Sequence, residues 1–312
     1  MTEGGQITYT ATLTNPAQTP VTVTLSNGSV ITIKAGESVG TVVVDTPAND
    51  VYNNGSTVST TITGATGGNF ENLVPSTTPA VTTITDSIDT TTVSLTATNT
   101  VTEGGQITYT ATLTNPAQTP VTVTLSDGSV ITIKAGESVG SVVVDTPPND
   151  VYVNGSTVST TITGATGGNF ENLVPNTTPA VTTITDSIDT TTVTLTAPSE
   201  ANEGGQITYT ATLSNKAGTD VTLKLDNGSS ITIKAGDTVG TVTVPAPSDD
   251  VFIDKSTQTV KITDTAGGNF EKLEVAGDGA TTTINDTIDK VDVVLTATTT
   301  VGEGGNIVYT AS

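Results

Sequence analysis

Hydrophobic and polar residues alternate along most of the chain. Between residues 105 and 114, Ile107, Tyr109, Ala111 and Leu113 take every second position, with threonines between and after them. This alternation predicts a half-buried β-strand, because successive side chains of a strand point to opposite faces. The same reasoning predicts seven strands in this part of the chain: 90–98, 105–114, 120–126, a short strand with Ile131 and Ile133, 138–145, 157–163 and 180–185.

The alternating pattern returns every 100 residues. The stretch "TEGGQITYTATLTNPAQTPVTVTLS" begins at Thr2 and again at Thr102, and shorter versions begin at Glu203 and Glu303. No long helical pattern interrupts it, and threonine, which favours strands, is abundant. Seven short strands separated by turns are typical of an immunoglobulin-like β-sandwich. We therefore expect an all-β chain of tandem immunoglobulin-like β-sandwich domains.

The period sets the expected domain boundaries. We expect repeat 1 at residues 1–88, lacking its first strand, complete domains at 89–188 (repeat 2) and 189–288 (repeat 3), and the start of a further domain at 289–312 (the tail). Met1 begins in the middle of the pattern, so we expect the chain to be a piece of a longer protein. The tail carries "VDVVLTATTT", the strand that repeat 1 lacks. We expect a monomer in dilute solution, with weak head-to-tail association.

Composition excludes several classes of function. Acidic residues outnumber basic ones 31 to 9, which gives a net charge of −22 and argues against binding to nucleic acid or to an anionic membrane surface. The chain has no histidine and no cysteine, which excludes zinc sites, disulfides and catalysis based on His or Cys. It has no apolar run long enough to insert into a membrane. We do not expect an enzyme, and cations are the ligands that the charge favours.

The acidic residues gather at one end of each predicted domain. Strands alternate in direction, so the turn after the first strand, the loop after the fifth and the end of the last strand share one end. In repeat 2 this end carries Glu103, Asp150, Asp186 and, in the linker, Asp189. The loop "GGNFE" of the following domain faces the same junction from the other side. Carboxylate and amide oxygens would therefore converge from both domains.

Such a convergence suits Ca²⁺, which takes six to eight oxygen ligands. Without a cation the carboxylates would repel one another. The candidate ligands are Glu3, Asp50, Asp86, Asp89, Asn169 and Glu171 at the first junction; Glu103, Asp150, Asp186, Asp189, Asn269 and Glu271 at the second; and Glu203, Asp250, Asp286 and Asp289 at the end of repeat 3.

Each of these residues also has a simpler explanation. Asp86 and its equivalents could form turns, Glu103 could be a solvated charge beside two glycines, and Asp150 could serve solubility. Phe170 could plug the core beneath its loop, whatever its neighbours do. It is the convergence at one end of the domain that favours Ca²⁺. Asp45 and Asp145 are weaker candidates, because Pro245 takes their place in repeat 3.

Four motifs in this 100-residue period, "VTEGGQITYTATL", "GGNFENL", "PPNDVY" and "DSIDTTTV", resemble the extender repeats of giant RTX adhesins. These include the Lap-type biofilm adhesins and the giant ice-binding adhesin. The resemblance covers the whole chain. It implies bacterial immunoglobulin-like domains in tandem, Ca²⁺ at the linkers, type I secretion and a place on the bacterial cell surface. The chain has no "GGxGxD" array and no recognisable ligand-binding domain, so it would belong to the stalk rather than the tip.

We therefore expect an extracellular structural segment, stiffened by Ca²⁺ between neighbouring repeats, that projects a distal binding domain. The alternative is an adhesive module that itself binds a glycan or a protein. The scarcity of aromatic residues, with no tryptophan and ten phenylalanines and tyrosines together, argues against a platform that stacks on sugars. Threonine arrays such as "TYTATLT" could also suggest an ice-binding face, but the β-propensity of threonine explains them.

Overall fold

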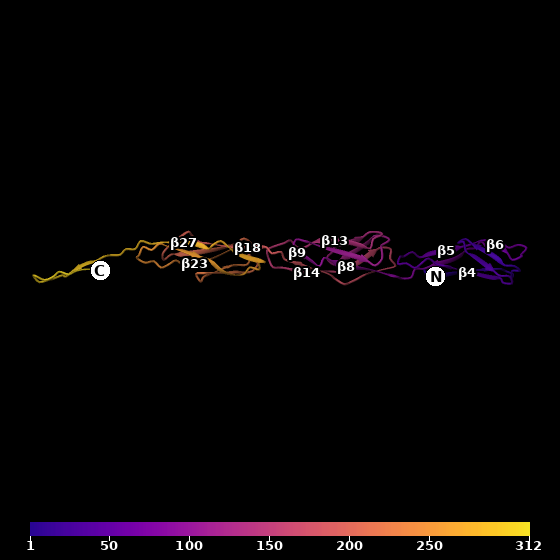
Figure 1. The fold of residues 1–312 in the computed structure, drawn as a ribbon, viewed down its shortest axis with the longest axis horizontal. Helices are drawn as coiled ribbons and strands as arrows, with labels where there is room; N and C mark the ends of the chain where they lie inside the picture. Colours follow the sequence, from indigo (N-terminus) through magenta and orange to yellow (C-terminus); the bar gives the residue numbers. More distant parts are fainter. The chain divides into compact units, whose positions relative to one another are not determined.

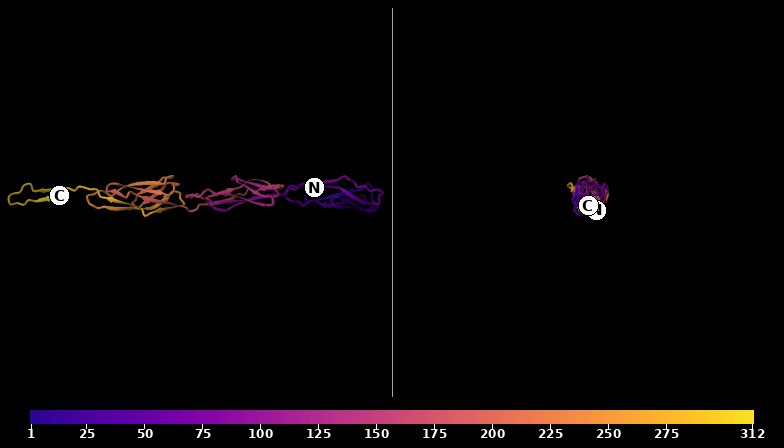
Figure 2. Two further views of the ribbon diagram at one scale, coloured as in Figure 1. Left: turned by 90° about the horizontal axis from the view of Figure 1, so that it is seen from above. Right: turned by 90° about the vertical axis from the view of Figure 1, so that its right-hand side faces the viewer.

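The computed structural model describes all of residues 1–312, and its regular elements are β-strands alone (Figures 1 and 2). The prediction of an all-β chain is therefore confirmed. No helix is present that could cross a membrane. By their contacts the residues form two compact units, which are Met1–Val101, Gly105–Thr146 and Thr157–Ile184 in the first, and Thr102–Gly104, Pro147–Ser156 and Thr185–Ser312 in the second.

Repeat 2 shows one layer of the sandwich in complete form. The layer has the strand order β13-β10-β8-β16. The first three strands pair antiparallel, whereas β16 runs parallel to β8. The strands are β8 (Thr90–Ala97), β10 (Gln106–Leu113), β13 (Val139–Asp145) and β16 (Asn172–Pro175).

The second layer of repeat 2 consists of two sheets joined by one broken strand. The orders are β12-β11-β15 and β14-β17-β9. The strand predicted at 157–163 covers most of β14 and the beginning of β15, which runs on to Gly167 where a loop was expected. The two strands separate at Thr161. The register of β15 with β11 then shifts at Thr163, because Ile162 pairs with Leu125 and Gly164 with Thr124. The strands are β9 (Thr100–Thr102), β11 (Val121–Leu125), β12 (Val130–Ile133), β14 (Ser156–Thr160), β15 (Ile162–Gly167) and β17 (Ala180–Thr185).

The inward positions of the alternating pattern form the core. In repeat 2, Tyr109, Val121 and Ile131 are almost completely buried, while the threonines between them are mostly exposed. Burial of each large apolar side chain contributes roughly 1.5–3 kcal/mol. Each repeat has its own core cluster of buried residues. Each repeat is therefore stabilised by its own core, and the residues at its ends can be polar without loss of core packing.

Repeat 3 follows the same plan, with the layers β23-β20-β18-β26, β22-β21-β25 and β19-β27-β24. Its strands are β18 (Thr190–Thr196), β19 (Glu200–Asn202), β20 (Gln206–Leu213), β21 (Val221–Leu225), β22 (Ser230–Ile233), β23 (Val239–Pro245), β24 (Ser256–Val260), β25 (Ile262–Gly267), β26 (Lys272–Ala276) and β27 (Ala280–Asn285). The tail forms a short hairpin of β28 (Leu295–Ala297) and β29 (Tyr309–Ala311).

Repeat 1 has the same strands except those that depend on its missing first strand. Its strand β1 pairs with β4 alone, whereas β10 pairs on both edges. Residues 72–75, which correspond to β16, form no strand here, because the strand that β16 pairs with has no counterpart in repeat 1. The strands are β1 (Gln6–Thr12), β2 (Val21–Leu25), β3 (Val30–Ile33), β4 (Val39–Asp45), β5 (Ser56–Thr60), β6 (Ile62–Gly67) and β7 (Ala80–Ile84).

Candidate metal sites at the repeat junctions

The turn "EGG" places one glutamate at the end of each repeat. In repeat 1 the backbone N–H of Glu3 donates to the carbonyl of Thr85 (3.2 Å), and that of Gly4 donates to the carbonyl of Pro47 (2.8 Å). Gly4 has a φ of 67°, in the left-handed region that favours glycine. The turn is thereby tied to the end of β7 and to the loop after β4. Glu3 therefore lies beside the acidic residues of both.

The loop "GGNFE" brings a second glutamate from the following repeat. Gly167, Gly168 and Asn169 have φ values of 98°, 81° and 58°, and these three successive left-handed residues reverse the chain sharply. A Cβ at Gly168 would lie 2.3 Å from the ring of Phe170, so the ring can pack closely only against glycine. The reversal leaves Glu171 immediately before β16.

The parallel pairing of β16 with β8 then sets Glu171 beside the linker. Asn172 lies opposite Thr90, so the residues just before them, Glu171 and Asp89, are neighbours. The backbone N–H of Asp89 donates to Oε2 of Glu171 at 2.6 Å. At the second junction the N–H of Asp189 makes the equivalent 2.6 Å bond to Glu271.

Three carboxylates from two repeats meet at each junction. Glu3, Asp86 and Glu171 each contribute one oxygen, and these oxygens lie within 4.8 Å of one another. Glu103, Asp186 and Glu271 form the equivalent group at the second junction. We call these groups the first and second junction triads. All members of the first triad belong to the first compact unit, and all members of the second belong to the second unit.

Each carboxylate of the triads has one buried oxygen that lacks a hydrogen-bond partner. In the first triad these are Oε2 of Glu3, Oδ1 of Asp86 and Oε1 of Glu171. The other oxygen of Asp86 accepts a bond from the N–H of Asn54 (3.0 Å), and that of Glu171 is held by Asp89. The backbone thus orients these two carboxylates and leaves one oxygen of each free. The second triad has the same three unpartnered oxygens, on Glu103, Asp186 and Glu271.

The electrostatics of the triads disfavour three negative charges. Burial raises the pKa of Glu3 above its ordinary value, and the charges of Asp86, Asp50 and Glu171 raise it further, although a hydrogen bond from the Asp50 N–H acts in the opposite direction. In the second triad burial again raises the pKa of Glu103, followed by the charges of Asp150 and Asp186. A proton or a cation would relieve the repulsion.

The spacing of the triad carboxylates suits a calcium ion. Ca²⁺ binds oxygen at 2.3–2.6 Å, so two of its ligands can lie up to about 5 Å apart. The triads, within 4.8 Å, meet this limit. Buried carboxylate oxygens without hydrogen-bond donors are also the hard ligands that Ca²⁺ takes. The residues present therefore fit the ion.

The other residues predicted at these junctions lie outside the triads. Asp50 accepts hydrogen bonds from the N–H of Tyr52 (2.7 Å) and the side chain of Asn54 (2.9 Å), and Asp150 makes the same two bonds in repeat 2. Asp89 accepts a bond from Asn49, and Asp189 from Asn149, both at 2.6 Å. These four carboxylates therefore hold the junction loops through hydrogen bonds.

The two predicted asparagines connect neighbouring repeats. The carbonyl of Asn169 accepts a bond from the N–H of Asn53 (3.0 Å), and its amide donates to Gln118 (2.8 Å) and to the carbonyl of Asn53 (3.3 Å). Asn269 forms the same backbone bond with Val153 (3.1 Å). Their left-handed backbone and their interrepeat bonds are the roles that the structure shows for them.

Sequence reasoning missed an aromatic contact at each junction. Tyr52 stacks on Phe170 with ring centroids 5.6 Å apart, and its hydroxyl donates to the carbonyl of Pro116 (2.6 Å). Tyr152 stacks on Phe270 at 5.9 Å. Phe170 also packs against the core of its own repeat, as the sequence suggested. The sequence signal for this contact is that "DVY" in one repeat is followed by "GGNFE" in the next at both junctions.

The end of repeat 3 has a different third carboxylate. Glu203 and Asp286 lie there as predicted, and Asp254, which was not predicted, joins them to form the repeat 3 cluster. Asp250 accepts a bond from the N–H of Phe252 (2.7 Å), and Asp289 is exposed. Repeat 3 therefore supplies all three carboxylates of its cluster.

Comparison with known proteins identifies the repeats. The family model of the LapA domain matches residues 1–87, 89–187 and 189–287, and so covers most of the chain. A search of curated proteins found no match. The resemblance to Lap-type adhesin repeats noted in the sequence is confirmed by the family match.

Proposed function

The chain belongs to the LapA domain family, a family of adhesin repeats at the cell surface, and we propose that it is an extender segment whose neighbouring repeats are held together by Ca²⁺. One observation carries this proposal. At two junctions, three carboxylates from two different repeats each place an oxygen within 4.8 Å of the others, and each of them has one buried oxygen without a hydrogen-bond partner. A bound Ca²⁺ would supply the positive charge that this arrangement lacks.

Because the ligands come from two repeats, a bound ion would hold the two repeats together. At the second junction, repeat 2 contributes Glu103 and Asp186, and repeat 3 contributes Glu271. An ion held by all three can bind fully only when the two repeats are in place. Binding and alignment are therefore coupled, because a ligand that prefers one arrangement shifts the population toward it.

The other parts of the proposal follow from the family. Adhesin repeats of this type form a stalk, so the chain would project a distal binding domain from the bacterial cell surface. Export by a type I system is part of the same proposal. The carboxylates lie at junctions and not in a cleft with a nucleophile or a general base, which supports a structural role rather than catalysis.

Ca²⁺ titration of two matched variants tests the proposal. Glu171→Gln with Glu271→Gln removes one charged ligand from each triad while keeping side-chain size. The control is Glu71→Gln, because Glu71 is the equivalent residue of repeat 1 and is exposed and outside both triads. Calorimetry should show the loss of two binding events in the double variant and none in the control. Equal binding by both variants would overturn the proposal.

Thermal unfolding provides a second measure in the same samples. Binding to the folded state alone stabilises it by about 2.7 kcal/mol per site when the ligand is at a hundredfold excess over Kd. We expect removal of Ca²⁺ to lower the melting temperature of the wild type and of the Glu71→Gln control, and to have a smaller effect on the double variant. Mg²⁺ should replace Ca²⁺ poorly, because it requires a tighter octahedral site.

A further inference from the structure

The chain contains four Asn-Gly-Ser sequences, and they lie in two kinds of structure. They begin at Asn27, Asn54, Asn154 and Asn227. Asparagine is a thermolabile residue, and it is most reactive before glycine, which has no side chain to shield its backbone nitrogen. Because the two residues that follow are the same in all four cases, we expect the structure to decide which asparagines react.

Asn27 and Asn227 are exposed residues of hairpin turns, between β2 and β3 and between β21 and β22. The backbone N–H of Ser29 donates to Oδ1 of Asn27 at 3.0 Å. That of Ser229 donates to Oδ1 of Asn227, also at 3.0 Å. To make this bond the side chain bends over the peptide group of the intervening glycine. The carbon of the side-chain amide, Cγ, therefore lies on the side of the glycine nitrogen.

Asn227 has a second donor on its carbonyl oxygen. The hydroxyl of Ser229 donates to the same Oδ1 at 2.7 Å. Two donors stabilise the negative charge that this oxygen gains when a nucleophile attacks the carbon. The nucleophile is the nitrogen of Gly228, whose N–H donates to the carbonyl of Leu225 (3.1 Å). This turn bond lies at the exposed tip of a hairpin, so it can open without unfolding of the repeat.

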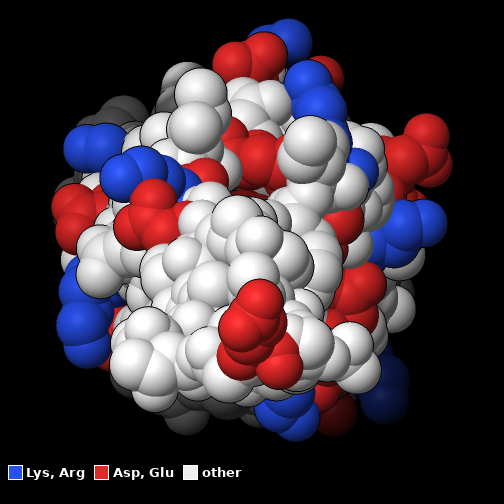
Figure 3. Space-filling view, turned by 90° about the vertical axis from the view of Figure 1, so that its left-hand side faces the viewer, with Lys and Arg blue, Asp and Glu red and all other residues white.

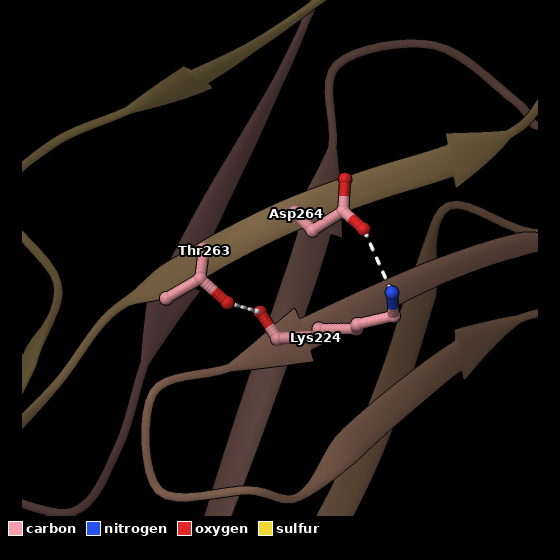
Figure 4. A network of polar contacts seen from close by, with 3 residues as sticks. All are labelled: Lys224, Thr263 and Asp264. Carbon is pink, nitrogen blue, oxygen red and sulfur yellow. Dashed lines mark hydrogen bonds and ion pairs between the residues drawn. The ribbon is translucent and has the colours of Figure 1, made fainter.

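The base of this hairpin is held by the neighbouring strand. Lys224 lies directly opposite Asp264 on β25, with Nζ and Oδ2 2.9 Å apart (Figure 4). The hydroxyl of Thr263 donates to the carbonyl of Lys224 at 3.1 Å. The N–H of Asp226 donates to the carbonyl of Lys261 (3.0 Å), and its carboxylate accepts from the N–H of Lys261 (3.1 Å). Opening therefore concerns the tip of the hairpin rather than its base.

Asn54 and Asn154 are held in the opposite direction. Their side-chain amides donate to the carboxylates of Asp50 (2.9 Å) and Asp150 (3.0 Å), which lie four residues earlier. Each side chain therefore points back along the chain, away from the glycine that follows. The negative charge beside the amide also disfavours the anion that forms during attack. These two asparagines should be protected, although they are exposed.

Repeat 2 shows that the hairpin accepts aspartate. Its residue at this position is Asp127. The N–H and the hydroxyl of Ser129 donate to Oδ1 of Asp127 at 2.9 and 2.6 Å. Gly128 has a φ of 86°, and the equivalent glycines of the other two repeats have a φ of 84°. Aspartate formed in repeats 1 and 3 would therefore leave the turn intact.

We propose that Asn27 and Asn227 are sites of spontaneous deamidation, with water as the only co-reactant. The glycine nitrogen attacks Cγ of the asparagine, the new N–Cγ bond closes a succinimide ring, and the Cγ–Nδ2 bond breaks. The side-chain nitrogen leaves as ammonia and takes the proton of the glycine N–H. Water then opens the ring at Cγ, which gives aspartate, or at the backbone carbonyl, which gives isoaspartate. No atom is oxidised or reduced.

The two products differ in their effect on the repeat. Both add a negative charge to a surface on which acidic side chains already lie close to lysines (Figure 3). Only isoaspartate lengthens the backbone, by a methylene group. The bond from the N–H of Leu225 to the carbonyl of Ser229 (2.9 Å) then loses its register. The edge strand β22, which carries the fully buried Ile231 and Ile233, should open more often.

Mass spectrometry of the full chain, aged in mildly alkaline buffer and then digested, tests this inference. All four sites are measured in one sample, so Asn54 and Asn154 are the controls for Asn27 and Asn227. We expect the hairpin sites to gain aspartate and isoaspartate at least about threefold faster than the other two, which is the effect of one exposed hydrogen bond on a barrier. In a sample unfolded in urea, the four rates should become similar.

Two variants test the role of the turn. Ser229→Ala removes the hydroxyl donor, and it should slow the reaction of Asn227 by about threefold while Asn27 reacts as before. Asn227→Asp is the control for charge, and its β22 amides should exchange hydrogen as slowly as in the wild type, whereas those of the isoaspartate fraction should exchange faster.

The inference is overturned if Asn54 and Asn154 react as fast as the hairpin sites in the folded chain. It is also overturned if the hairpin sites stay intact while the unfolded chain is deamidated.

Discussion

At the scale of single residues, the hydroxyl of the core tyrosine has a hydrogen-bond partner in repeats 1 and 2 but not in repeat 3. Tyr9 and Thr60 share a hydrogen bond of 2.9 Å, and Tyr109 and Thr160 share one of 2.8 Å. In repeat 3 the threonine is replaced by Val260, and the hydroxyl of the buried Tyr209 has no partner. Burial raises the pKa of Tyr209, and the charge of Asp226 adds to this effect.

Restoring the threonine should stabilise repeat 3. An unsatisfied buried hydroxyl costs about 1–3 kcal/mol, and a new hydrogen bond contributes about 1 kcal/mol. We therefore expect Val260→Thr to raise the free energy of unfolding of repeat 3 by about 1 kcal/mol. Hydrogen exchange of the β24 amides would measure it, with Thr160→Val as the reciprocal variant in repeat 2. Faster exchange in Val260→Thr would show that the valine is favoured for its packing.

The buried glutamates should make stability depend on pH when no cation is present. The pKa values of Glu3, Glu103 and Glu203 are raised above the ordinary 4.5. A glutamate with a raised folded pKa stabilises the fold below its unfolded pKa, and this contribution disappears as pH rises through the folded pKa. In cation-free buffer, the melting temperature should therefore fall as pH rises from about 4.5 to 7.

A triple variant separates this effect from the general charge of the chain. Replacing Glu3, Glu103 and Glu203 with glutamine should flatten the profile, and saturating Ca²⁺ should reverse its slope in the wild type, because protons then compete with the ion. Identical profiles for the wild type and the triple variant would assign the pH dependence to other acids.

The candidate ligands could be predicted from the sequence only in part. Glu3, Asp86 and Glu171 were found because the order of strands places their loops at one junction. The distinction between these residues and Asp50 or Asp89 depends on which oxygens are already bonded to backbone N–H groups, and spacing does not reveal this. Asp254 was missed because its importance comes from the direction of one side chain.

At the scale of elements, the alternating pattern identified the seven strands but missed the short strand β16 and the break between β14 and β15. The strand β16 has four residues, "NLVP", which is too short and too close to a proline to be recognised by alternation. It matters because its parallel pairing with β8 sets Glu171 beside Asp89. The break between β14 and β15 was also unforeseen, since the apolar pattern continues through it.

The aromatic stack should contribute to Ca²⁺ binding by holding the junction loops in place. An aromatic pair contributes about 0.5–1.5 kcal/mol beyond burial, and the hydroxyl of Tyr152 also donates to the carbonyl of Lys216 (2.8 Å). We expect Tyr152→Ala to weaken Ca²⁺ binding at the second junction by about tenfold, equivalent to about 1.4 kcal/mol. Calorimetry would measure the change.

Phe252→Ala provides the control for the stack. Phe252 is the equivalent residue of repeat 3, and it is 73% exposed. This variant should leave all binding events unchanged. If Tyr152→Ala also has no effect, the stack does not contribute to the ion site.

The open edge of repeat 1 offers a place for a strand from another copy of the chain. A cavity of about 420 Å³ lies along β1, lined by Ile7, Tyr9, Leu25 and Ile31 among others. In repeat 2 the edge of β10 is covered by β8. The tail has the matching strand, and its Val293 and Leu295 are exposed. In the tail, however, β28 already pairs with β29, which corresponds to β10 and would have to be displaced.

Head-to-tail association should therefore be weak. Burial of three apolar side chains contributes about 5–8 kcal/mol, and ordering the tail backbone costs about 1–2 kcal/mol per residue. Analytical ultracentrifugation should show concentration-dependent association of the full chain, and none of a chain ending at Asp289. Monomeric behaviour of both up to about millimolar concentration, where the free energy of binding is only about −4 kcal/mol, would contradict this prediction.

At the scale of the whole molecule, Ca²⁺ bound at the junctions should restrict the movement of one repeat against the next. Each repeat has its own core, so each should remain folded when the ions are removed. Only the junctions should change. A loss of β structure on removing Ca²⁺ would show instead that the carboxylates stabilise the repeats themselves.

Small-angle X-ray scattering of the full chain, with Ca²⁺ and then with a chelator, tests this central claim most directly. We predict that the radius of gyration falls when Ca²⁺ is removed, returns when it is restored, and responds little to the chelator in the Glu171→Gln, Glu271→Gln variant. Circular dichroism of the same samples should show unchanged β structure. A radius of gyration and distance distribution that are the same with and without Ca²⁺ in the wild type would contradict the account.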